Sequence, residues 1–177
     1  MLAACSPVDS APVGENLASK VKLQPASDFK SVVWNDETYV RTQAKSYPLI
    51  DSWIYTRIGE SPEHFSQRVE VQRYKKVDAA EIFRQMQEAV GTRAKDSDMA
   101  TRTICYEHDP EGMPLYEASV WRYADVVNTK GETLTYATGV TYRFADLNAY
   151  KNYVGNTFMK VCQGMRAQEV IAPPALS

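Results

Sequence analysis

The sequence predicts an α+β fold, in which a twisted, mainly antiparallel sheet of five to six strands is packed by two helices on one face. Three strand-like segments precede a helix, and three more precede a second helix. The links between strands are short and rich in turn residues, which favours antiparallel neighbours because a parallel crossover needs about a dozen residues. A single two-layer domain over residues 28–170 accommodates all these elements.

The first three predicted strands are short and rich in aromatic and β-branched residues. They cover Ser31–Trp34, Trp53–Ile58 and Phe65–Tyr74. In the third, apolar and polar residues alternate, which is typical of a strand with one buried face and one wet face. Turn residues at Gly59–Pro62 separate it from the second strand.

The first helix is predicted to begin after Asp78 and to end at Gly91. Asp78 and Glu81 have the spacing of a capping box, in which each side chain bonds the other residue's backbone N–H. Five apolar residues recur at helical spacing: Ile82, Phe83, Met86, Ala89 and Val90. The polar stretch Thr92–Ala100 is expected to be a loop.

Three further strands and a helix complete the predicted domain. The strands are expected at Ala100–His108, Leu115–Val127 and Leu134–Phe144. Asp146 is expected to cap the helix and Gly164 to end it. Its apolar stripe consists of Leu147, Tyr150, Val154, Phe158, Val161, Cys162 and Met165. The tail, residues 171–177, is expected to be frayed.

The composition is that of an ordinary globular domain and argues against several function classes. Hydrophobic residues make up 44% and charged residues 24%, with a net charge of −2. No basic excess is present to neutralise phosphates, so nucleic acid is not an expected partner. Because His64 and His108 belong to no metal-ligand spacing, we expect neither a metal nor another cofactor.

The N-terminus reads Leu2-Ala3-Ala4-Cys5 and resembles the lipobox of bacterial lipoproteins. The resemblance covers these residues alone and implies that Cys5 is lipid-modified after cleavage by signal peptidase. A complete signal peptide has a basic segment and an apolar segment before the cysteine. Residues 1–5 are therefore expected to be the remnant of a signal peptide that extends upstream of Met1.

Residues 6–27 are rich in Ser, Pro, Ala and Asp and are expected to form a flexible tether. A lipid-bearing cysteine followed by a polar tether is the usual layout of a lipoprotein. Ser6 resembles the outer-membrane sorting signal of enteric lipoproteins. The resemblance thus implies an outer-membrane lipoprotein that faces the periplasm and is held in the membrane by its acyl chains.

Two further cysteines, Cys105 and Cys162, form an even pair in a chain that is expected to be exported. In an oxidising compartment such a pair is interpreted as a disulfide. The long loop that it closes predicts a stabilisation of up to ~4 kcal/mol. The alternative is two separate buried thiols.

Motifs for catalysis are missing from the sequence. Glu107-His108-Asp109 places an acid beside an imidazole, but consecutive strand residues point to opposite faces and are not expected to form a triad. Gly-x-Ser-x-Gly and glycine-rich phosphate loops do not occur. The basic cluster of Arg73, Lys75 and Lys76 is expected to be a solvated loop, with contact to anionic headgroups as the alternative.

Aromatic side chains on the last two long strands are the candidates for a binding surface. They are Tyr116, Trp121, Tyr123, Tyr136 and Tyr142. If they cluster on a wet face, they would suit a glycan, a peptide or a partner protein. The alternative is ordinary sheet packing under the helices.

Three hypotheses about function follow from these features. The first is a non-enzymatic, lipid-anchored envelope protein that serves as an accessory subunit or chaperone of an outer-membrane assembly, such as a secretion or transport system. The second is a periplasmic ligand-binding or inhibitor module that uses the aromatic sheet face. The third is a small cell-envelope hydrolase, which requires carboxylates or a Ser/His pair to converge in a cleft.

Overall fold

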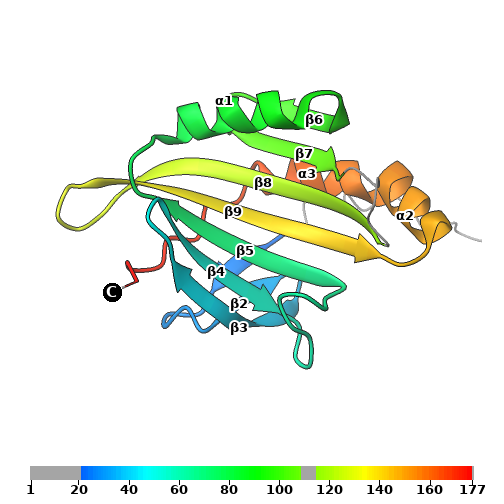
Figure 1. Ribbon diagram of the computed structural model, residues 1–177, viewed down its shortest axis with the longest axis horizontal. Coiled ribbons are helices and arrows are strands. Elements are labelled where there is room, and N and C mark those ends of the chain that lie inside the picture. Colours follow the sequence, from blue (N-terminus) through cyan, green and yellow to red (C-terminus); the bar gives the residue numbers. More distant parts are fainter. Residues whose placement is uncertain (1–20, 109–114, 177) are drawn as a thin grey trace, which may run out of the picture.

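The computed structural model describes residues 21–108 and 115–176, and within these ranges nine strands form one curled antiparallel sheet (Figure 1). The strand order across the sheet is β1-β2-β3-β4-β5-β9-β8-β7-β6. The strands are β1 (Leu23–Pro25), β2 (Ser31–Trp34), β3 (Glu37–Ser46), β4 (Ile50–Thr56), β5 (Gln67–Tyr74), β6 (Ala94–Asp98), β7 (Thr103–Glu107), β8 (Tyr116–Val127) and β9 (Thr133–Phe144).

The α+β class is confirmed, but the expected count of five to six strands is too low. The strands that the sequence does not reveal are β1, β3 and β6. They are short or polar, and none shows the alternation that a half-buried strand needs. Their pairing with neighbouring strands, β2, β4 and β7, defines them instead. The predicted loop at Thr92–Ala100 therefore contains a strand.

The two predicted helices begin where expected, after Asp78 and after Asp146, but the structure divides the helical residues into more segments. They are α1 (Ala79–Val90), the short 3-10 turn η2 (Gly91–Arg93), and a continuous run of α2 (Leu147–Tyr153), the π-helical η3 (Val154–Phe158) and α3 (Met159–Met165). Asp78 accepts a hydrogen bond from the N–H of Glu81 at 2.9 Å, and Asp146 accepts one from Ala149 at 2.7 Å. The Glu81 carboxylate does not complete the capping box, because it bonds Arg84 and Gln85.

The helices lie on opposite faces of the sheet, so the expected packing of both on one face is wrong. Neighbouring residues of each central strand point to different cores: Val120 and Tyr136 to one, Trp121 and Ala137 to the other. The core on the α2–α3 side also contains Trp34, Trp53, Tyr55, Phe158 and Met165. The core on the α1 side contains Phe83, Val90, Ile104 and Tyr123.

The α1 side depends on a close approach between Trp121 of β8 and Gly139 of β9. These two residues are direct neighbours in the β8–β9 ladder. A Cβ atom built on Gly139 would lie 2.3 Å from the Trp121 ring. The absence of a side chain at position 139 thus lets the indole lie flat on the sheet beneath α1.

Cys105 of β7 and Cys162 of α3 lie side by side, as the sequence predicts. Their Cα atoms are 6.1 Å apart, within the range for a disulfide, and both side chains are fully buried. The pair therefore joins the sheet to the helix on its α2–α3 face.

Both ends of the described chain pack against the sheet. Val21 and Leu23 are buried, so the sheet includes the last residues of the segment expected to be a tether. The tail was expected to be frayed, but its first residues pack on the sheet: Ile171 is buried and donates its N–H to Thr138, and the Pro173 carbonyl accepts from Tyr136. Cys5 and residues 6–20 lie outside the described residues. None of the described helices has the length and apolar character needed to span a membrane.

Candidate functional site

An apolar hollow of the described surface lies between α1 and the tip of the β3–β4 hairpin. We call it the α1 groove, and its volume is about 550 Å³. Its lining residues are Leu49, Ile50, Tyr74, Lys76, Val77, Ile82, Gln85, Met86 and Ala89. A smaller hollow of about 420 Å³ continues it over β4 and shares Leu49 and Ile50.

The groove exists because the apolar face of α1 is wider than the part that the sheet covers. Phe83 and Val90 are buried against the sheet. Ile82 and Met86 lie on the flank of that core and remain partly exposed in the groove. Across from them, the hairpin tip exposes 49% of Tyr47 and 59% of Leu49. Apolar side chains that face one another across a hollow are suited to hold an apolar segment.

A buried carboxylate holds the hairpin tip in place. Asp51 is fully buried and accepts from Ser46 at 2.6 Å. The Lys75 ammonium lies 2.8 Å from Asp51 and also donates to the Tyr47 carbonyl at 2.7 Å. Arg73 completes the ion pairing of Asp51. The wall of the α1 groove is thus fixed to the end of β5.

The charge balance at Asp51 favours its ionised form. Burial by itself would raise the pKa of Asp51, but the hydrogen bonds from Lys75 and Ser46 and the charges of Arg73 and Lys75 outweigh it. The pKa of this carboxyl is therefore held below its ordinary value. The basic cluster is therefore not simply a solvated loop, because Arg73 and Lys75 pair with Asp51, although Lys75 and Lys76 both remain exposed.

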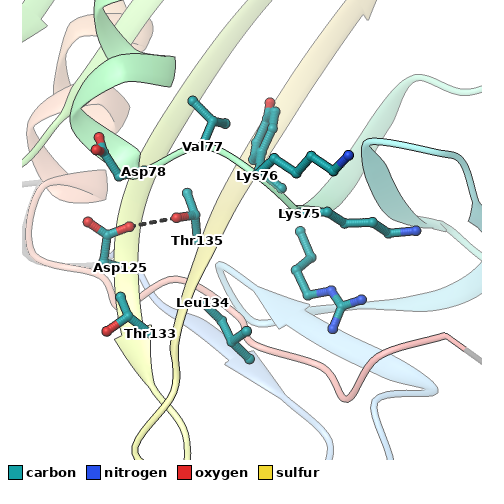
Figure 2. Close-up of a pocket in the computed structure, with 10 residues that line it drawn as sticks. Lys75, Lys76, Val77, Asp78, Asp125, Thr133, Leu134 and Thr135 are labelled. Carbon is teal, nitrogen blue, oxygen red and sulfur yellow. Dashed lines mark hydrogen bonds between the residues drawn. The ribbon is translucent and has the colours of Figure 1, made fainter.

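A polar pocket of about 400 Å³ lies on the other side of the β5–α1 link (Figure 2). Asp125 accepts from the N–H of Ala79 at 3.0 Å and from Thr135 at 2.7 Å, which ties β8 and β9 to the first turn of α1. In Figure 2, Asp78 and Asp125 lie on one side of the pocket, while Lys75 and Lys76 extend to the opposite side. The lysines thus point toward the hairpin tip rather than toward the two aspartates.

His108 belongs to a polar cluster that the sequence does not reveal. Its Nε2 lies 2.7 Å from the Ser119 hydroxyl, and its Nδ1 lies 3.6 Å from a carboxylate oxygen of Glu117. Burial lowers the pKa of His108 and, together with the smaller effects of Arg68, Arg93 and Arg143, outweighs the opposing charge of Glu117. The surroundings of the imidazole therefore favour its neutral form.

This cluster contains the residue types of a hydrolytic triad, but its serine is not accessible to a substrate. Ser119 is fully buried, and its hydroxyl also lies 2.7 Å from Thr141. The hollow beside His108 has a volume of about 320 Å³. Among the described residues that line it, Ser119 does not occur. A nucleophile must reach its substrate, so the arrangement does not support Ser119 in that role. Glu107, predicted to lie at a solvated strand end, accepts from Tyr150 at 2.7 Å.

The five aromatic residues proposed as a binding surface do not share one exposed face. Trp121 and Tyr123 are buried beneath α1. Tyr136 and Tyr142 are buried in the core on the α2–α3 side, where Tyr116 packs at the margin and stacks on Tyr150. The alternative, ordinary sheet packing under the helices, therefore describes these residues.

The sequence analysis did not single out the α1 groove. The one signal for it in the sequence was the width of the apolar stripe on α1, which includes Ile82 and Met86.

Comparisons of the chain with protein-family models, curated proteins and solved structures found no match. Among residues 21–108 and 115–176, no group of three or more His, Cys, Asp or Glu side chains is placed to hold a metal ion.

Proposed function

We propose that this chain is a non-catalytic, lipid-anchored protein of the bacterial envelope, an accessory subunit that holds an apolar segment of a partner protein in the α1 groove. The observation that carries the proposal is the groove itself, which has apolar side chains on both walls and a volume of about 550 Å³. The lipobox at Cys5 supports the anchor, and the disulfide-compatible pair Cys105–Cys162 supports an oxidising compartment.

The edges of the sheet are poorly suited to another mode of partner binding, in which the partner adds a strand to the sheet. β1 has three residues and ends in Pro25. β6 carries Lys95, Asp96 and Asp98, and charges of this kind protect an edge against pairing. Side-chain recognition in a groove therefore suits this surface better than β-augmentation.

The test compares two exposed apolar residues, of which one lies in the groove. The tagged protein, its Leu49→Glu variant and its Ile58→Glu variant are purified from detergent-solubilised envelope, and bound proteins are quantified by mass spectrometry. Ile58 is 82% exposed and does not line the groove, so its variant is the matched control. We expect Leu49→Glu to lose the partner and Ile58→Glu to keep it.

Binding must then be reproduced with the purified partner. We expect Leu49→Glu to weaken that affinity at least about tenfold, which corresponds to ~1.4 kcal/mol. If the same proteins bind all three forms equally, or if none binds, the groove is not the docking site. The same spectra show whether Cys5 carries a lipid, which tests the anchor separately.

A further inference from the structure

The charges around the α1 groove point to the chemistry of its occupant. We propose that the groove binds an amphipathic helical segment whose apolar side chains lie between α1 and the hairpin tip and whose acidic end lies on Lys45 and Lys76. This inference rests on the proposed function, because it names the kind of segment that the same groove holds.

The unneutralised charges that face the groove are positive. Lys76 lines the groove directly and is exposed. Lys45 is exposed on β3 and pairs in register with Ser52, which lines the continuation of the groove over β4. No carboxylate of the described residues lies within salt-bridge distance of either lysine. Both ammonium groups are thus available to a partner's carboxylates.

The acidic groups near the groove either have a cationic partner or do not line the groove. Glu70, which lines the continuation over β4, lies 3.5 Å from Arg68 and accepts from Gln72 at 2.8 Å. On α1, Glu81 and Glu88 share the single cation Arg84, and neither of them lines the groove. Lys75, next to Lys76, is neutralised by Asp51. Among the residues that line the groove and its continuation, the charged ones are Lys76 and the paired Glu70, and this balance favours acidic side chains in the occupant.

The shape of the surface favours a polypeptide over a lipid bilayer. Tyr47, Leu49, Lys45 and Lys76 would also suit an anionic membrane surface. A flat bilayer, however, does not reach into a hollow to contact Ile82 and Met86, whereas the side chains of a helix do. The groove thus selects a segment that carries its own apolar ridge.

The test uses a panel of three synthetic helical peptides with one identical leucine ridge. One terminal turn carries glutamates in the first peptide, glutamines in the second and lysines in the third. Binding to the whole protein is measured by fluorescence anisotropy at low and high salt. The protein variants are Lys45→Glu/Lys76→Glu and, as a charge-matched control on α2 and α3, Lys151→Glu/Lys160→Glu.

We expect the glutamate peptide to bind most tightly and the lysine peptide most weakly. Lys45→Glu/Lys76→Glu should weaken the glutamate peptide roughly tenfold and strengthen the lysine peptide. High salt should reduce both effects. The Lys151→Glu/Lys160→Glu protein should bind as the unmodified protein does, and circular dichroism should confirm that every variant is folded.

Two outcomes would overturn the inference. If all three peptides bind equally and all lose affinity with Leu49→Glu, the groove docks a segment but has no preference for an acidic end, and the proposed function stands. If no peptide binds while phosphatidylglycerol vesicles bind through Leu49 and Lys76, the surface contacts lipid and both proposals fail.

Discussion

Among single residues, Asp51 has the largest influence on the shape of the candidate site. It lies fully buried between Arg73 and Lys75, and Lys75 in turn bonds the hairpin tip. In the sequence these three residues looked unrelated, because a basic cluster beside a turn is normally solvated. Their association depends on the pairing of β4 with β5, which places Asp51 opposite Arg73.

We predict that Asp51→Asn destabilises the protein by up to ~3 kcal/mol, because it leaves two partly buried cations without a counter-charge. The pKa of Asp51 is lowered in the folded state, so its contribution is complete above the ordinary pKa of about 4 and is lost as the pH falls through the lowered value. The difference in free energy of unfolding between the two proteins should therefore be largest at neutral pH and shrink below about pH 4.

Denaturant titrations across this pH range provide the measurement. Asp36→Asn is the control, because Asp36 is exposed in a turn with φ of 66°, a conformation that asparagine also adopts. A gap between the wild type and Asp51→Asn that is the same at pH 3 and pH 7 would contradict this account.

The sequence predicted the helices and strands in which apolar residues recur with a clear period. It did not predict the strands that are recognisable only through their pairing with neighbouring strands. The cap at Asp78 and the apolar residues Phe83 and Val90 identified α1 within one or two residues of its bounds. β3 is polar along most of its length and is recognisable as a strand through its ladders with β2 and β4. The π-helical turn at Val154–Phe158 also had no signal, because the apolar stripe continues through it.

The contact between β7 and α3 leads to a prediction about redox conditions. Cys105 and Cys162 are separated by 57 residues, and a bridge across such a loop is expected to contribute about 4 kcal/mol. Reduction should therefore lower the melting temperature of the purified protein. A Cys105→Ala/Cys162→Ala variant should melt at the lower temperature with or without reductant.

Thermal unfolding with and without dithiothreitol measures this effect. Intact mass after alkylation without reductant counts the free thiols in the same samples. Two alkylated thiols at positions 105 and 162 in protein isolated from the envelope would show that the bridge is not formed there.

For the molecule as a whole, the topology explains what sequence patterns did not predict. The class and six of the strands follow from local patterns, but a pattern does not state which face of the sheet each helix covers. The order β5-β9-β8-β7 places the centre of the sheet between α1 and α3. The α1 groove depends on this arrangement, because the groove forms where the apolar side of α1 extends beyond the part of the sheet that the helix covers.

The C-terminal segment belongs to the same whole-molecule arrangement. Ile171 is 2% exposed in the core on the α2–α3 side, although the proline-rich tail was expected to be frayed. We predict that Ile171→Ala destabilises the protein by about 2–4 kcal/mol, the usual cost of removing a buried aliphatic side chain.

Chemical denaturation of Ile171→Ala and of the nearby exposed-site variant Glu169→Ala measures this cost. Glu169→Ala should change the free energy of unfolding by no more than about 0.5 kcal/mol. Equal, small effects of the two substitutions would mean that the tail does not pack in solution.

The position of Trp121 on Gly139 gives the protein an intrinsic fluorophore at one face. Trp34 and Trp53 belong to the core on the α2–α3 side, whereas Trp121 lies in the cluster that Ile82 and Met86 flank. A chain carrying Trp34→Phe and Trp53→Phe would emit from this single indole. Its emission would then follow the environment beneath α1 alone, without an added label.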